Sequence, residues 1–290
     1  MRKVYYRRKR VKWGRLFGVI GVFVLLVAVV AGGITVAATQ RKPKFDDSIL
    51  GTAYVEEEMP IPTATPKPTP KPTGKNVREP KFKAEMVSAY NGDGGKSAYL
   101  TFDDGPTTNI TPKILDILKE KNAVATFFLL GKNVEAHPEL VQRELAEGHA
   151  LANHSYSHDY KKLYNGTDYF REDIKKAEQA IRNAVGDAGV TKVFRFPGGS
   201  FEKSKNPQKE VLYEEGYVFI DWNSLNGDAE AQNVPASKLL ENVKKTTKGI
   251  NNVVILMHDA ATKQTTVDAL PSIIDYLREE GYEFKTLKNE

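Results

Sequence analysis

Short apolar runs alternate with stretches of helical periodicity from residue 81 to residue 290, and this alternation restricts the possible folds more than any other feature. The apolar runs are 98–102, 123–130, 150–152, 193–196, 218–222, 253–258 and 284–287. Apolar residues recur at helical spacing in 111–118, 170–185 and 270–277. This alternation is typical of a parallel α/β fold. About seven strands predict a barrel or a distorted barrel, whose functional residues lie at the C-terminal ends of the strands.

The first 40 residues have the composition of a membrane segment. Residues 1–15 carry eight Lys or Arg and no acid, and residues 16–40 include no charged residue. The uncharged run exceeds the roughly 20 residues that cross a bilayer, and the positive charges before it predict a cytoplasmic N-terminus. We therefore expect a single transmembrane signal-anchor at 16–40. A cleaved signal peptide is the alternative, because Val36-Ala37-Ala38 is an acceptable cleavage site. In either case the domain at 81–290 is expected outside the cell.

Residues 41–80 are interpreted as a Pro-rich, disordered linker. The segment 60–72 is rich in Pro and Thr, which favours polyproline II over helix or sheet. At about 3.1 Å per residue, this segment would reach on the order of 40 Å. Such a linker would hold the domain at 81–290 away from the bilayer.

Charge and cysteine content exclude several classes of protein. Removing the eight N-terminal charges takes the formal net charge from +5 to −3, so the basic character belongs to the tail and does not indicate nucleic-acid binding. The chain has no cysteine, which excludes disulfides, thiolate metal sites and a cysteine nucleophile. Any metal ion must be held by His, Asp or Glu.

Two adjacent acids end the run at 98–102. In a regular strand, Asp103 and Asp104 would point to opposite faces. Because Gly105-Pro106 breaks the strand, both carboxylates could turn toward one site. A surface turn is the alternative, since Asp, Gly and Pro are common turn residues.

A histidine pair follows the run at 150–152. His154 and His158 are four residues apart and could face one ion. With one carboxylate they would form a two-His, one-carboxylate set, which suits a catalytic Zn²⁺ or another first-row divalent ion. His137 and His149 are interpreted as ordinary surface histidines.

Two further strand ends carry polar residues. A guanidinium such as that of Arg195 lowers the pKa of a nearby carboxylate and keeps it ionised as a base, and the following Gly198-Gly199 could present a backbone N–H to an oxyanion. An ordinary turn with a surface arginine is the alternative. His258 stands at the tip of 253–258, where it suits a general acid. Asp259 is interpreted as the N-cap of the next helix.

These residues resemble, in order, the motifs of the polysaccharide deacetylase (NodB-homology) family of carbohydrate esterases. The matching motifs are Thr101-Phe102-Asp103-Asp104-Gly105-Pro106, His154-Ser155-Tyr156-Ser157-His158, Arg195-Phe196-Pro197-Gly198-Gly199 and Leu256-Met257-His258. The resemblance implies a distorted (β/α)7 barrel for 81–290, preceded here by the transmembrane helix and the Pro-rich linker.

The resemblance also implies a role for each residue. Asp103 would be the catalytic base, Arg195 would orient it, and His258 would be the general acid, tuned by Asp228. The remaining implied roles are metal binding by Asp104, His154 and His158, oxyanion binding by the Gly198 N–H, and substrate contacts by Leu256 and Trp222. Zn²⁺ is the expected ion, with Co²⁺ or another first-row ion as the alternative.

The chain departs from the family pattern at two places. Family members often carry Tyr where Gly198 stands, although the implied oxyanion contact needs only the backbone N–H of this residue. In the fourth motif, which here spans 222–229, Leu225 and Ala229 replace an Asp and a Trp. These two substitutions are expected to alter the substrate groove.

The expected function is therefore metal-dependent removal of N-acetyl groups from an extracellular polysaccharide, with peptidoglycan N-acetylglucosamine as the leading substrate. Chitin, xylan or an exopolysaccharide are alternative substrates. A metal-dependent phosphatase would require a phosphate-binding loop, and none is evident. A non-catalytic wall-binding module would be expected to have lost Asp103 or His258. We expect a monomeric catalytic domain attached to the membrane by one helix.

Overall fold

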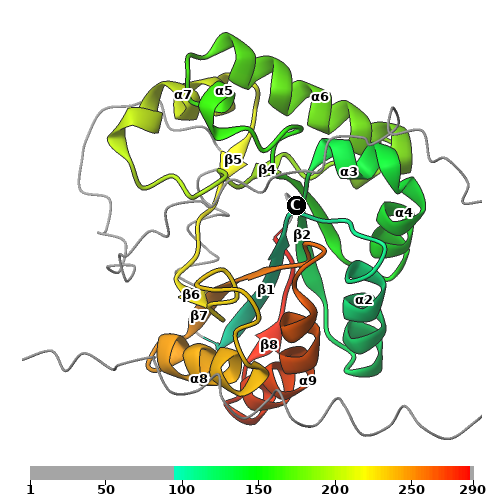
Figure 1. The fold of residues 1–290 in the computed structure, drawn as a ribbon, viewed down its shortest axis with the longest axis vertical. Helices are drawn as coiled ribbons and strands as arrows, with labels where there is room; N and C mark the ends of the chain where they lie inside the picture. The colour runs from blue at the N-terminus through cyan, green and yellow to red at the C-terminus, as the bar shows by residue number, and fades with distance from the viewer. Residues whose placement is uncertain (1–94, 288–290) are drawn as a thin grey trace, which may run out of the picture. The chain divides into compact units, whose positions relative to one another are not determined.

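The computed structural model describes residues 95–287, and within them eight strands form one parallel sheet with helices around its outside (Figure 1). The strands are β1 Ser97–Asp103, β2 Ala125–Leu129, β3 Ala150–Asn153, β4 Val193–Phe194, β5 Val218–Phe219, β6 Ser224–Leu225, β7 Asn252–His258 and β8 Glu283–Phe284. The helices are α2 Thr111–Glu120, α3 Gly131–Ala136, α4 Pro138–Ala146, α5 Tyr160–Leu163, α6 Asp168–Val185, α7 Asn206–Glu214, α8 Ala236–Thr247 and α9 Gln264–Glu279.

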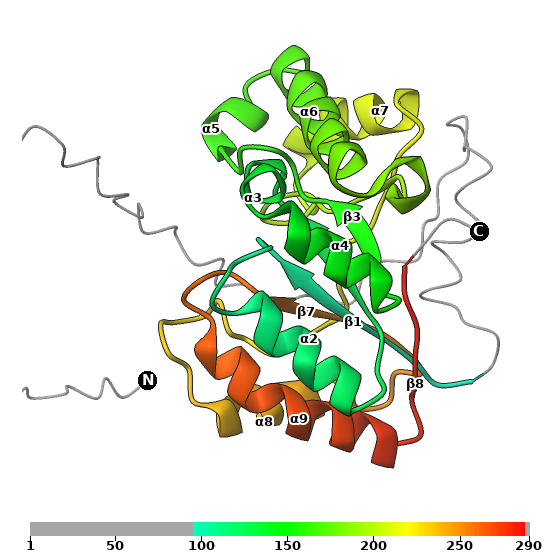
Figure 2. The same ribbon diagram turned by 90° about the vertical axis from the view of Figure 1, so that its right-hand side faces the viewer.

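The sheet is a curved, open version of the expected barrel. Its strand order is β5-β4-β3-β2-β1-β7-β6, and β8 pairs with the start of β1. The helices follow the same order, since α8 packs on α9, α9 on α2, α2 on α4, and α4 on α6. Figure 2 shows α2, α8 and α9 on the outer side of β1 and β7. Because no ladder joins β5 to β6 among the described residues, the sheet does not close there.

The two faces of the sheet bury separate hydrophobic clusters. The outer face packs against the helices through residues such as Leu100, Phe127 and Ile255. The inner face carries a smaller cluster, whose buried members are Tyr99, Phe128, Ala152, Val193, Val218, Ile220, Val254 and Leu287. Side chains alternate between the faces along a strand, so a strand buried on both sides is a nearly continuous apolar run. This explains the uninterrupted runs of the sequence.

Most predicted elements are confirmed, but their lengths differ. The predicted helices at 111–118 and 170–185 become α2 and α6. The third begins earlier than predicted, at Gln264, and continues through Pro271. Strand β6 was not predicted, because Ser224–Leu225 is too short to show a pattern of its own. It is recognisable only by its pairing with Ile255 and Leu256 of β7.

Within residues 95–287, no helix combines the length and the apolar character that crossing a bilayer requires. The predicted signal-anchor at 16–40 and linker at 41–80 lie outside the described residues.

Candidate active site

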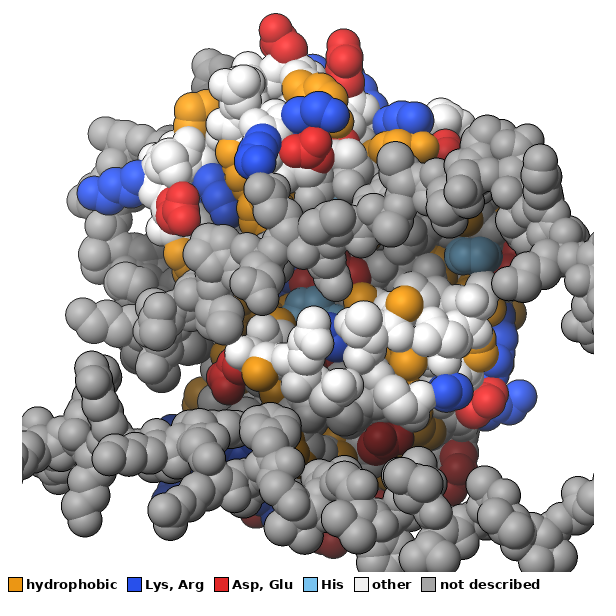
Figure 3. Space-filling view, viewed as in Figure 1, with side chains coloured by type: hydrophobic (Ala, Val, Ile, Leu, Met, Phe, Trp, Pro, Cys, Tyr) orange, Lys and Arg blue, Asp and Glu red, His pale blue; other side chains and the backbone are white. Residues whose placement is uncertain are grey.

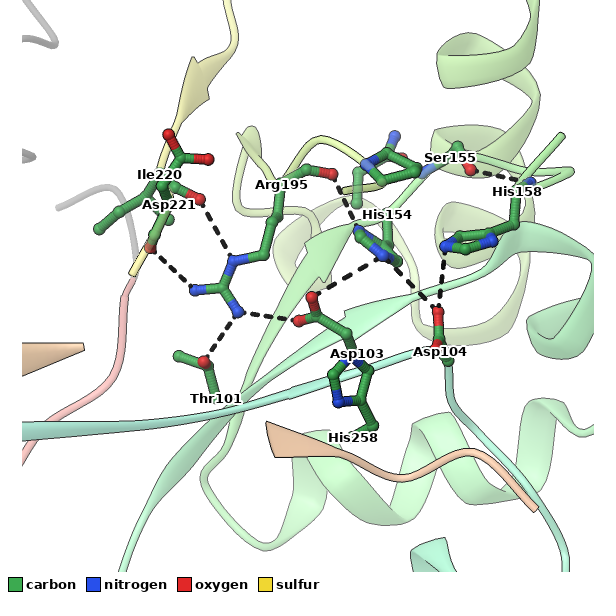
Figure 4. Close-up of polar contacts among 12 residues, drawn as sticks. Thr101, Asp103, Asp104, His154, Ser155, His158, Arg195, Ile220, Asp221 and His258 are labelled. Atoms are coloured by element: carbon green, nitrogen blue, oxygen red, sulfur yellow. Dashed lines mark hydrogen bonds and ion pairs between the residues drawn. The ribbon is translucent and has the colours of Figure 1, made fainter. Parts of the chain in front are cut away.

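The site lies above the inner hydrophobic cluster, at the C-terminal ends of the strands. Residues separated by an even number of positions share a face of a strand. Several strands therefore continue from an apolar residue of the inner cluster to a polar residue at the tip. These polar residues are Asp103 beyond Tyr99, His154 beyond Ala152, Arg195 beyond Val193, and His258 beyond Val254. Figure 4 shows that their side chains converge.

Asp104 joins this site through an unusual backbone conformation. As the neighbour of Asp103 it would face outward in a regular strand, but its φ of 78° turns the chain into the left-handed region. Its backbone oxygen accepts a hydrogen bond of 2.8 Å from the Asn133 side chain. A Cβ on the following Gly105 would lie 2.0 Å from Oδ2 of Asp259, so only glycine fits there. The turn thus brings both carboxylates to one place.

The histidine pair meets the Asp104 carboxylate. Oδ1 of Asp104 lies 3.6 Å from Nε2 of His154 and 3.3 Å from Nε2 of His158. One potential ligand atom from each of the three residues lies within 4.8 Å of the other two. His158 has a φ of 58° and its backbone N–H donates to the hydroxyl of Ser155. In the space-filling view, a histidine surface is visible beside acidic side chains near the centre of this face (Figure 3).

The neutral ring of His154 and an unpaired oxygen of Asp104 fit a divalent cation. Nδ1 of His154 lies 2.9 Å from the carbonyl oxygen of Arg195, so Nδ1–H donates there and the lone pair of Nε2 faces Asp104. Burial, together with the neighbouring His158, lowers the pKa of His154 to about 3 and keeps the ring neutral. Oδ1 of Asp104 is buried and has no hydrogen-bond partner among residues 95–287. A buried acceptor without a donor is costly, and a cation would satisfy it.

Asp103 is paired with a completely buried arginine. Arg195 donates 2.8 Å hydrogen bonds from Nη1 to Oδ1 of Asp103 and to the hydroxyl of Thr101. It also donates to the carbonyl oxygens of Ile220 and Asp221. These contacts fix the Asp103 carboxylate in one orientation.

The net pKa of Asp103 differs from the sequence-based expectation. The positive charge of Arg195 lowers it, as expected, but burial has the larger effect and raises the pKa above its usual value. Proton uptake by this carboxylate is therefore easier than for an exposed aspartate.

His258 has its own carboxylate partner. Oδ1 of Asp228 lies 2.7 Å from Nδ1 of His258. Oδ2 of Asp228 accepts hydrogen bonds from the His258 backbone N–H and from the Thr266 hydroxyl. Burial disfavours a charged imidazole, but the negative charge and hydrogen bond of Asp228 outweigh it and raise the pKa of His258 to about 9. The pKa of Asp228 is correspondingly lowered despite its burial. At neutral pH the pair is Asp⁻ and His⁺.

The three residues expected to contact substrate border this centre. Leu256 is half-buried on β7, two residues before His258. Trp222 is also half-buried, and its ring meets that of Phe201 edge to face at 5.3 Å. Gly198 is exposed with a φ of 72°, and a Cβ there would lie 2.9 Å from the ring of Tyr160. That ring packs edge-on against His158 at 5.2 Å.

Two minor predictions were wrong. His149 is not a surface residue: it is 4% exposed, and its ring packs against Phe127. Asp259 is not a helix N-cap, because α9 begins only at Gln264. Its buried carboxylate instead accepts a 2.5 Å hydrogen bond from the Thr111 hydroxyl, and burial raises its pKa to about 7. In both cases long-range packing outweighed the local sequence context.

Sequence reasoning also missed residues that support the site. Asp173 of α6 accepts hydrogen bonds from the backbone N–H groups of Tyr156 and Ser157, which hold the loop between the two histidines. An acid on the buried face of an amphipathic helix was a detectable signal for it. Thr101 and Asp221 both contact Arg195. Thr101 opens one of the motifs but had no predicted role, and Asp221 had no signal in the sequence.

Comparisons with known proteins show which family and which solved structures the chain resembles. The family model described as polysaccharide deacetylase matches residues 90–216. A peptidoglycan-N-acetylglucosamine deacetylase of Bacillus cereus is 38% identical over 212 residues, which cover 70% of this chain and 73% of that protein. A CE4 esterase of Streptococcus mutans has a similar structure, with a TM-score of 0.64 and 35% identity over 70% of this chain and 90% of its own. A polysaccharide deacetylase of Bacillus cereus gives a TM-score of 0.62 and 37% identity over 67% and 93%.

Proposed function

This chain belongs to the polysaccharide deacetylase family, and from that premise we propose that it is a metal-dependent hydrolase that removes N-acetyl groups from extracellular peptidoglycan, at N-acetylglucosamine. The observation that carries the proposal is the convergence of Asp104, His154 and His158 within 4.8 Å. Two further groups flank this set. The expected base, Asp103, is paired with Arg195, and the expected acid, His258, is paired with Asp228.

Asp104, His154 and His158 would hold the metal ion, for which Zn²⁺ is the leading candidate because two imidazoles and one carboxylate suit it. When bound, such an ion supplies Lewis acidity for a carbonyl group and lowers the pKa of water toward about 7. Co²⁺ or another first-row divalent ion would be compatible with the same ligands.

The other residues of the site carry the proton transfers. Asp103 accepts a proton from the attacking water, whose oxygen forms the new bond to the acetyl carbon. The Gly198 N–H faces the negative charge that develops on the carbonyl oxygen. His258 donates its proton to the sugar nitrogen as the carbon–nitrogen bond breaks, which gives acetate and a free amine. A positioned acid or base typically contributes about 10²–10⁴-fold to the rate.

The N-terminal composition supports a membrane location for the enzyme. The basic residues 1–15 and the uncharged run 16–40 would form a signal-anchor, with the N-terminus in the cytoplasm and the hydrolase domain facing the cell wall. A carbonate wash of membranes from cells expressing the full chain should leave the protein in the pellet. Protease added to intact protoplasts should remove the domain; protection from the protease would reject this orientation.

Substrate choice is testable with the full-length protein loaded with Zn²⁺. Acetate release should be fastest from purified peptidoglycan and slower from chitin oligomers and acetyl-xylan, and sugar analysis should find glucosamine in the product. Asp104→Ala should lose both bound metal and acetate release. If acetyl-xylan is preferred, the substrate assignment is wrong. Binding to peptidoglycan without acetate release would instead identify a wall-binding module.

A further inference from the structure

Lys205 is a buried lysine that the mechanism above does not use. It is 5% exposed and precedes α7. No carboxylate lies within ion-pair distance of its Nζ among residues 95–287. Buried cations are normally paired with an anion, because removing a charge from water is costly. An apolar side chain would fill the same space without that cost, so the retained ammonium group calls for a specific explanation.

The partners of Lys205 are backbone carbonyl groups of the turn that contains Gly198. Its Nζ donates to the carbonyl oxygen of Gly199 at 2.6 Å and to that of Pro197 at 3.3 Å. The Tyr164 hydroxyl donates to the same Pro197 oxygen at 2.6 Å, and Nζ of Lys205 lies 4.3 Å from the centre of the Tyr164 ring. Two side chains therefore hold one peptide group from the same side.

Fixing the Pro197 carbonyl also fixes the Gly198 N–H. The two groups belong to one trans peptide, in which C=O and N–H point in opposite directions, so the N–H points away from Lys205. The neighbouring amides are occupied: the Gly199 N–H donates to Phe196 and the Ser200 N–H to Asp221. Within the described chain, the Gly198 N–H has no acceptor, and its Cα lies beside Tyr160, which contacts His158.

The charge of Lys205 affects the strength of this donor as well as its direction. Hydrogen bonds that share a peptide group polarise one another, and the effect is larger where the dielectric constant is low. An ammonium group on the carbonyl oxygen draws electron density from the amide nitrogen, which makes the N–H a better donor. A neutral side chain at position 205 would not do this.

We propose that Lys205 is a positioning residue, which together with Tyr164 orients and polarises the Pro197–Gly198 peptide so that its N–H stabilises the oxyanion during deacetylation. The proposal rests on the proposed function, because it assigns the Gly198 N–H to that step. Lys205 lies outside the four motifs, so the reaction would depend on a charged residue that the motifs do not include.

Steady-state kinetics of the full-length, Zn²⁺-loaded protein test the role. Removing one oxyanion donor costs about 10²–10³ in kcat, so loss of its orientation in Lys205→Met should lower kcat by about 10- to 100-fold and change KM little. Bound zinc and Tm should stay near the wild-type values. Lys203→Met is the matched control, because Lys203 is exposed in the same short segment, and it should retain full activity. An unchanged kcat in folded Lys205→Met would overturn the proposal.

A double-mutant cycle distinguishes positioning from general support of the fold. Tyr164→Phe removes the other donor to the Pro197 oxygen, so its effect on kcat should be markedly non-additive with that of Lys205→Met. Additive effects would show that the two residues do not act on kcat through one peptide group, and losses of kcat that follow losses of Tm would show that they act only on stability; either result would overturn the proposal.

A spectroscopic readout keeps this inference separate from the proposed function. In protein labelled with ¹⁵N-glycine, the Gly198 amide resonance should shift in Lys205→Met and stay in place in Lys203→Met. An unmoved Gly198 resonance refutes the positioning role whatever the activity. Conversely, failure of the wild-type protein to release acetate from any substrate refutes the proposed function, while the spectra still decide whether Lys205 controls this peptide.

Discussion

Individual residues of the site owe their proton affinities to a competition between burial and partners. Asp103 is buried and His258 is half-buried, and both have raised pKa values, but for opposite reasons. Burial outweighs Arg195 at Asp103, whereas Asp228 outweighs burial at His258. Strands β1 and β7 pair with Asp103 opposite His258. The site therefore places a base that takes up a proton readily beside an acid that is protonated at neutral pH.

Asp228→Asn tests the origin of the His258 pKa. Without the carboxylate, the pKa of His258 should fall from about 9 by about one unit or more. Because the general acid must be protonated, the alkaline limb of the pH dependence of kcat/KM should move to lower pH. Asp268→Asn, at an exposed position of α9, should leave the profile unchanged. An alkaline limb that stays in place in Asp228→Asn would remove His258 from the role of acid.

The same pair makes stability depend on pH. The folded pKa of His258 is raised from 6.5 to about 9, so its contribution is complete below about 6.5 and is lost as pH rises through 9. The pKa of Asp228 is lowered from 3.8, so its contribution is lost in acid below that value. The free energies of unfolding of wild type and Asp228→Asn should differ most between these limits, near pH 5 to 6, and the difference should shrink as pH rises through about 9.

At the scale of elements, the turn after β1 is locked to the end of β7. The backbone N–H of Asp259 donates to the carbonyl oxygen of Asp103, and the Thr107 hydroxyl donates to that of Asp259. Gly105 packs directly on the Asp259 carboxylate. The position of Asp104 relative to the histidines therefore depends on contacts between segments about 150 residues apart in sequence.

Gly105→Ala should disturb this turn. The new methyl group would collide with the Asp259 carboxylate, and overpacking of this kind costs about 1–3 kcal/mol. Asp259→Ala would remove the obstacle, so the double variant should be more stable than the sum of the single effects predicts, by about 0.5–3 kcal/mol. Urea unfolding measures all three variants. A Cβ at Gly148 would meet no atom within 4 Å, so the effect of Gly148→Ala on stability should add to that of Asp259→Ala. If both glycine variants showed the same coupling energy with Asp259→Ala, the predicted collision at Gly105 would be contradicted.

For the whole described domain, a bound ion would join parts of an open barrel. The candidate ligands come from the turn after β1 and from the loop after β3, so the ion would link these two segments across the site. Ligands that bind only the folded state stabilise it by mass action, by about 2.7 kcal/mol at 100 times Kd. This makes thermal stability a measure of ion binding that is independent of catalysis.

Adding Zn²⁺ to metal-stripped protein should therefore raise Tm by about 5–10 °C at saturating concentration, given roughly 2–4 °C per kcal/mol for a domain of this size. His158→Ala should abolish the shift. His137→Ala should retain it, since His137 pairs with Glu139 away from the ligand set. Equal shifts in both variants would mean that zinc binds elsewhere. Differential scanning fluorimetry gives the three values directly.

Much of this arrangement was predictable from the sequence because it follows from local patterns. Apolar runs identified seven of the eight strands, and periodicity identified α2, α6 and α9. The tips of parallel strands meet at one edge of the sheet, so Asp103, His154, Arg195 and His258 could be placed in one site before any coordinates were known. Motif spacing and strand polarity are properties of short segments, and they determined the family, the fold class and the residue types of the site.

The tertiary structure decided what depends on contacts between distant segments. Sequence indicated that Arg195 would lower the pKa of Asp103, but only the depth of burial decided the net direction. The role of Asp259 likewise follows from its contact with Thr111, about 150 residues away. The role of Lys205 follows from its contacts with Gly199 and Tyr164. Desolvation and hydrogen-bond geometry are set by the whole packed domain, and for that reason no local pattern encodes them.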